Sequence, residues 1–101
     1  MEDFKIFLDK DLKVPAGNPI DLGKLKAGHT KKFTFYIYNS SVNPHDEINV
    51  VVDSSEVSVI SFPETMEEKS HAMLILEWKP KINIKQGLKA IIKIESYEVF
   101  T

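Results

Sequence analysis

The segment from Thr30 to Asn39, TKKFTFYIYN, constrains the fold of this chain more than any other. Phe33, Phe35 and Ile37 alternate in it with a threonine and two tyrosines. Successive side chains of a strand point to opposite faces, so the segment has one apolar face and one aromatic, partly polar face. Aromatic and β-branched residues are typical of such a half-buried pleated surface. The pattern predicts the central strand of a β-sandwich.

Length and composition indicate one globular domain. The chain has 101 residues, of which 43% are hydrophobic and 28% charged, an ordinary globular balance that argues against disorder. A chain of this length buries roughly 60–68% of its unfolded surface, which is enough for one core. We therefore predict a single domain over residues 1–101.

The N-terminus, the apolar runs and the lack of cysteine give expectations about the cellular location. The N-terminal residues MEDFKIFLDK begin acidic and have only a short apolar run, unlike a signal peptide. No segment approaches the length of a membrane span. Cysteine is absent, whereas small secreted domains often carry disulfides. We expect an intracellular, cytoplasmic chain or one incorporated into a virion, without membrane contact.

Strand signals recur along the chain between turn-rich stretches. Besides the central strand, they cover Phe4–Leu8, Ile20–Leu25, Glu47–Val52, Val57–Phe62, Ala72–Trp78 and Leu88–Glu95. The charged stretch Glu64–Lys69 is interpreted as a turn, since six residues without caps make a marginal helix. About seven to eight short strands without a helix predict an all-β, antiparallel, immunoglobulin-like β-sandwich.

The same alternation predicts the core. Apolar side chains on one face of each main strand would pack between the two sheets. The predicted core comprises Phe33, Phe35, Ile37, Ile48, Val50, Val52, Leu74, Leu76, Trp78, Leu88, Ala90, Ile92 and Ile94.

Four separated pieces resemble the ASH domains, the Hydin-type, major-sperm-protein-like immunoglobulin folds. DLGKLKAG at 21–28 resembles their F/L-G-x-V/L-x-x-G opening, and Phe33–Asn39 resembles their second strand, which closes on asparagine. LILEWKP at 74–80 resembles their hydrophobic strand that closes on a proline. Gly87–Ile94 resembles the next strand of these domains, which is introduced by a glycine. The resemblance spans roughly residues 19–95. It implies a binding or scaffolding module without catalysis.

The chain departs from that pattern at two points. Nothing matches the basic, peptide-binding face of the trafficking members of the major-sperm-protein group. Only Ser96–Thr101 follows the last strong strand, so a full closing strand is not evident. Three arrangements stay open: the Leu88 strand continues through Tyr97 and Val99, Phe4–Leu8 fills the gap, or a neighbouring molecule supplies a strand. We favour the second, because the N-terminal apolar residues need a place to bury.

No catalytic constellation is visible. The serines lack a nucleophile-elbow setting, and no phosphate-cradling glycine loop occurs. His29, His45 and His71 are scattered. His45-Asp46-Glu47, with Asp53 nearby, has metal-ligand chemistry, but metal motifs have tighter and more repetitive spacing. We predict no enzyme, catalytic residue, metal or cofactor, and interpret this stretch as a solvated loop.

Nucleic acid is also not expected as a partner. The densest positive stretch comprises Lys24, Lys26, His29, Lys31 and Lys32. The net charge is −2, so acidic residues elsewhere offset it. We interpret the stretch as a solvated edge.

The outward face of the central strand is the candidate interaction surface. Tyr36 and Tyr38 would lie beside Met73 and Ile75 if the two strands share a sheet, and Val51 and Ile91 would add apolar spots on the other sheet. Exposed tyrosine and methionine have the composition of a partner surface. The alternative is ordinary surface, because single exposed apolar residues are common and cross-strand aromatic pairs also stabilise sheets.

These observations predict a non-enzymatic structural or scaffolding protein. It would mediate protein–protein contacts, with a partner or by self-assembly, as a component or decoration of a larger assembly such as a virion head or tail. The alternative is a soluble adaptor or chaperone-like module that binds a peptide strand at an open sheet edge.

Overall fold

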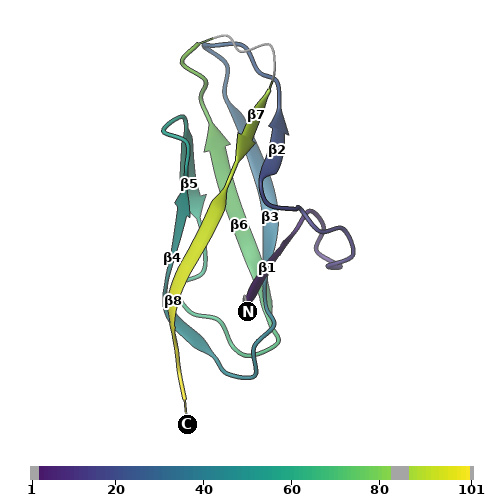
Figure 1. Ribbon diagram of the computed structural model, residues 1–101, viewed down its shortest axis with the longest axis vertical. Coiled ribbons are helices and arrows are strands. Elements are labelled where there is room, and N and C mark those ends of the chain that lie inside the picture. Colours follow the sequence, from purple (N-terminus) through teal and green to yellow (C-terminus); the bar gives the residue numbers. More distant parts are fainter. Residues whose placement is uncertain (1–2, 83–86, 101) are drawn as a thin grey trace.

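A computed structural model describes residues 3–82 and 87–100 of the chain. Within these residues it is all-β, with antiparallel pairing throughout (Figure 1). The strands are β1 (Phe4–Phe7), β2 (Ile20–Gly23), β3 (Lys31–Asn39), β4 (His45–Val52), β5 (Val57–Ser61), β6 (His71–Trp78), β7 (Leu88–Ala90) and β8 (Ile92–Glu98). The predicted fold class, an antiparallel β-sandwich, is confirmed. No helix in the described residues has the length and apolar character needed to cross a membrane.

The first layer is a four-stranded sheet in the order β1-β3-β6-β5. Strand β3 lies inside it, paired with β1 on one side and with β6 on the other. Phe35 is registered with Leu74, and both side chains are buried. The segment predicted as the central strand therefore occupies an interior position of the sheet, with the predicted face turned to the core.

The second layer is formed by two strand pairs, β2 with β7 and β4 with β8. Only Ile91 separates β7 from β8, and the alternation continues through it: Ala90 and Ile92 are buried, while Ile91 and Lys93 are exposed. One extended segment thus pairs first with β2 and then with β4. Figure 1 shows this segment running diagonally across β3 and β6.

The core lies between the two layers. Nine predicted core residues are buried: Phe35, Ile37, Ile48, Val50, Leu74, Leu76, Trp78, Ala90 and Ile92. The other four, Phe33, Val52, Leu88 and Ile94, are partly buried and pack against them. Ile20, Leu22, Val57 and Met66 are additional core residues that the alternation had not identified.

The N-terminal strand does not occupy the place we favoured for it. Strand β1 pairs with β3, with Ile6 opposite Ile37, and belongs to the first layer. The prediction that it fills the position beside the last strand is wrong, because pairing with β3 already gives Ile6 a partly buried place at the edge of the core. The last strand itself runs on to Glu98, as in the first of the three arrangements.

The charged stretch at 64–69, predicted as a turn, also packs against strand β4. Met66 is 4% exposed, and its backbone exchanges two hydrogen bonds of 2.9 Å with His45. The Ile48 amide donates to the Glu64 carbonyl at 3.0 Å. This stretch therefore covers part of the edge of β4 that faces away from β8.

Candidate functional site

The predicted outer surface of the first sheet is assembled as expected. Tyr36 lies opposite Met73, Tyr38 opposite His71, and Ile75 opposite Thr34. Met73 is 48% exposed, whereas both tyrosines are half-buried. Four of the six predicted surface residues therefore share one face.

Val51 and Ile91 lie elsewhere, on the second layer. They are 42% and 47% exposed. Val51 is opposite Lys93, and the Ile91 amide donates to the Asp53 carboxylate at 2.8 Å. These two residues add apolar surface to the other layer, separate from the tyrosines.

Strand β8 has a backbone edge that faces away from β4. In antiparallel pairs, every second residue pair exchanges backbone hydrogen bonds. The Asp53 amide donates to the Ile91 carbonyl at 3.1 Å, so the next bonded residue on β8 is Lys93, opposite Val51. The N–H and C=O groups of Ile92 and Ile94 consequently point away from β4. Within residues 3–82 and 87–100, β4 is the only strand paired with β8.

A groove of about 1060 Å³ lies between this edge and β1. Its apolar lining includes Phe4 and Ile6 from β1 and Ile92 and Ile94 from β8. At about 3.3 Å per residue, the length of β8 gives the groove room for an extended segment of roughly seven residues. Three of these four apolar side chains are only partly buried, so an occupant would cover them further.

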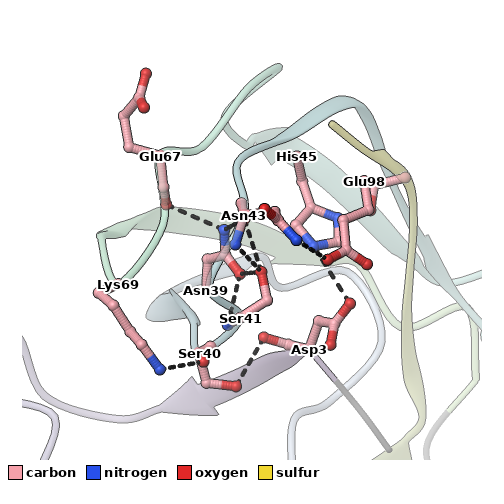
Figure 2. A network of polar contacts seen from close by, with 10 residues as sticks. Asp3, Asn39, Ser40, Ser41, Asn43, His45, Glu67, Lys69 and Glu98 are labelled. Atoms are coloured by element: carbon pink, nitrogen blue, oxygen red, sulfur yellow. Dashed lines mark hydrogen bonds and ion pairs between the residues drawn. The ribbon is translucent and has the colours of Figure 1, made fainter. Parts of the chain in front are cut away.

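One end of the groove is formed by polar side chains, which Figure 2 shows from close by. Asn39 anchors this region. Its side chain is fully buried, donates to the carbonyls of Asn43 and Glu67 at 3.1 and 3.0 Å, and accepts from the Ser41 hydroxyl at 2.8 Å. Next to it, the Ser40 amide and hydroxyl both donate to the Asp3 carbonyl, at 2.8 and 3.0 Å. The backbone of Asp3 is therefore held in place.

His45 lies in the middle of this end of the groove. Its ring is 4% exposed and packs edge-on against Phe4, with ring centroids 4.7 Å apart. Nδ1 is 2.7 Å from the Ser96 hydroxyl. Nε2 is buried and has no hydrogen-bond partner among the described residues, although it lies 3.3 Å from a carboxylate oxygen of Asp3. Glu98 is adjacent and accepts a 2.7 Å hydrogen bond from the side-chain Nδ2 of Asn43.

The interpretation of His45-Asp46-Glu47 as a solvated loop is wrong, because these residues begin strand β4 and His45 is 4% exposed. Asp53 does not join it, because its carboxylate binds the Ile91 amide. The histidine meets Asp3 and Glu98 instead, and ligand atoms of the three residues lie within 4.8 Å of one another. Two of these residues lie near opposite ends of the chain, so local spacing carried no signal of their meeting. His29 and His71 are exposed.

Comparisons with known proteins identify no family. Neither a scan against protein-family models, nor a search of curated proteins, nor a search of solved structures gives a match.

Proposed function

We propose that this chain is an immunoglobulin-like, ASH-type, non-enzymatic module that binds an extended segment of a partner protein along the open edge of β8. The observation that carries the proposal is the edge of Ile92 and Ile94, which no strand of the described residues pairs with, beside an apolar groove. An exposed strand edge is a ready template for pairing with another chain. In such strand addition, main-chain hydrogen bonds supply affinity and side-chain pockets supply specificity.

The strand order supports the immunoglobulin-like assignment. Constant-type immunoglobulin domains have strands A-B-E-D in one sheet and C-F-G in the other. With β1 as A and β3 as B, the observed order β1-β3-β6-β5 corresponds to A-B-E-D. Strand β4 is then C, and the β7–β8 segment is F. The groove lies on the side of β8 where strand G would pair with F.

The lining indicates the chemistry of the occupant. A strand placed beside β8 would turn alternate side chains toward the core. These side chains would meet Phe4, Ile6 and Ile94, which are apolar and partly buried. The expected partner segment is therefore extended, about seven residues long, apolar at every second position and free of proline, because proline lacks the amide hydrogen of a ladder.

A binding experiment with a designed peptide tests this function. The probe is an alternating Val/Thr peptide with terminal lysines, and its control contains the same residues plus two central prolines. We expect the first peptide alone to bind and to slow amide hydrogen exchange at Ile92 and Ile94. Ile94→Thr should weaken binding about tenfold or more, by loss of roughly 1.4 kcal/mol or more of apolar contact. Lys93→Thr, its exposed neighbour, should leave binding unchanged. Equal binding of both peptides would contradict the proposal.

A second function uses the outer face of the first sheet. Met73 is 48% exposed beside Tyr36, and residues of these two types are enriched at protein–protein interfaces. The partner we propose for this face is a larger assembly, such as a virion head or tail or a cytoskeletal array. Sedimentation at several concentrations tests self-assembly through this face. Met73→Ser should abolish a concentration-dependent oligomer, whereas Val51→Ser on the other layer should not. A monomer at all concentrations would contradict self-assembly.

A further inference from the structure

We propose that Asp3, His45 and Glu98 form a divalent-cation site, with Zn²⁺ as the expected ion, at the polar end of the groove. This inference is independent of the peptide-binding proposal. It would tie the start of β1, in the first layer, to the start of β4 and the end of β8, in the second. Figure 2 shows the three side chains turned toward one another.

The first support is the orphaned nitrogen of His45. Its Nε2 is buried and has no hydrogen-bond partner within residues 3–82 and 87–100, although an Asp3 oxygen lies only 3.3 Å away. Leaving a buried polar atom unsatisfied is costly, and native structures rarely do so without a reason. A cation bound between these two atoms would give Nε2 a partner.

The second support is the spacing of the ligand atoms. In a tetrahedral zinc site with bonds of about 2.0–2.2 Å, neighbouring ligand atoms lie roughly 3.3–3.6 Å apart. The separation of His45 Nε2 from Asp3 Oδ2 is 3.3 Å, and one ligand atom of Glu98 completes a set within 4.8 Å. Only a small movement of the Glu98 carboxylate would close the set around one ion.

The third support is the set of groups behind the ligands. Metal-binding histidines commonly donate the hydrogen of their second ring nitrogen to a fixed acceptor, which orients the ring. The 2.7 Å contact between His45 Nδ1 and the Ser96 hydroxyl suits this role, since Nδ1 can donate and leave Nε2 free for the ion. Asn43 donates to Glu98, and Ser40 holds the backbone of Asp3. Each ligand is therefore positioned by a neighbour.

The donor set favours zinc over the harder cations. Calcium takes six to eight oxygen ligands, and magnesium is bound through carboxylates and several waters. Imidazole suits zinc and its transition-metal neighbours. One imidazole and two carboxylates give three protein ligands, which leaves a fourth position for water or for a group of a bound partner.

Calorimetric titration of the purified chain with Zn²⁺, alongside Ca²⁺ and Mg²⁺, tests the site. We expect one Zn²⁺ per chain and no comparable binding of Ca²⁺ or Mg²⁺. Zn²⁺ at 100 times its dissociation constant should shift the folding equilibrium about 100-fold toward the native state. Substituted Co²⁺ should give the visible absorption of a tetrahedral site. Absence of stoichiometric binding would overturn the proposal.

Variants assign the binding to these residues. Asp3→Asn and Glu98→Gln keep side-chain size and should each weaken Zn²⁺ binding at least about 100-fold, because loss of a supporting partner alone costs 10–100-fold. Ser96→Ala removes the hydroxyl that contacts His45 Nδ1 and should weaken Zn²⁺ binding by about 10–100-fold. Asp46→Asn and His71→Asn are the matched controls and should change nothing. Unchanged binding in the first two variants, or equal loss in the controls, would refute the site.

Discussion

Tyr36 of β3 lies directly opposite Met73 of β6, on the face of the first sheet that is turned away from the core. Their strand neighbours Phe35 and Leu74 form the matching pair on the inner face, where both are buried. The same two strands thus present an apolar pair to the interior and an aromatic–thioether pair to the surface. This relationship separates positions that determine stability from positions available for contact.

Substitutions on the two faces should differ in their effect on stability. Leu76 is fully buried on β6, and Leu76→Ala should lower the free energy of unfolding by about 2–5 kcal/mol, through lost apolar transfer and a cavity. Tyr36→Ala should cost about 0.2–1 kcal/mol, the range of a cross-strand pair. Urea denaturation of both variants measures the difference. Equal losses would mean that the assignment of the faces is wrong.

A carboxylate at the start of β5 should make stability depend on pH. The Lys81 amide donates to Glu56 at 3.0 Å and the Trp78 indole donates at 3.3 Å. These hydrogen bonds, the backbone one first, hold the pKa of Glu56 below its ordinary value of 4.5. The pKa of Glu56 is therefore lower in the folded than in the unfolded chain, so its ionised form stabilises the fold. This stabilisation is complete above the ordinary pKa and is lost as the pH falls through the folded pKa.

Glu56→Gln should therefore be less stable than the natural chain at pH 7, and the difference should shrink at pH 3. Urea midpoints at both pH values measure it. Lys81→Ala keeps the backbone donor and removes only the side-chain charge, so most of the pH dependence should persist. A difference between Glu56→Gln and the natural chain that is equal at both pH values would contradict this account.

The alternation of side chains predicted the faces of the strands well. From Phe33 to Ile37 and from Leu88 to Ile94, a period of two follows from backbone geometry alone, so burial could be predicted without knowing which strands pair. Partner choice has no such local signature. The N-terminal strand was predicted to lie beside the last strand but pairs with β3. An apolar face indicates that a strand is buried, but it does not indicate which strand lies next to it.

The polar end of the groove was beyond prediction for a similar reason. His45 was interpreted as part of a solvated loop, but the pairing of β4 with β8 brings it to Glu98, and Asp3, just before β1, also lies beside it. Such a cluster depends on strand register across the whole chain. Met66 was missed for a different reason, since a single apolar residue among charges has no periodicity to mark it as buried.

Asn39 should contribute more to stability than any exposed asparagine. Asn39→Ala removes one of the two donors to each of the Asn43 and Glu67 carbonyls, and it removes the acceptor of the Ser41 amide. Both carbonyls keep a hydroxyl donor, so the expected loss is that of one unsatisfied group, about 1–3 kcal/mol. Asn49→Ala, at an exposed position of β4, should stay within about 0.5 kcal/mol. Chemical denaturation distinguishes the two, and similar small losses would contradict the anchoring role.

The approach of β7 to β2 requires a glycine at position 87. Gly87 has φ +81°, and a Cβ there would lie 2.9 Å from the Gly23 carbonyl oxygen. Gly28 also has positive φ, at +89°, but a Cβ there would meet nothing within 4 Å. Both alanine variants incur the cost of a left-handed backbone, about 1–2 kcal/mol, and only Gly87→Ala adds a clash with backbone. Gly87→Ala should therefore lower the unfolding midpoint further than Gly28→Ala in parallel thermal melts. Equal midpoints would show that β2 and β7 can separate without cost.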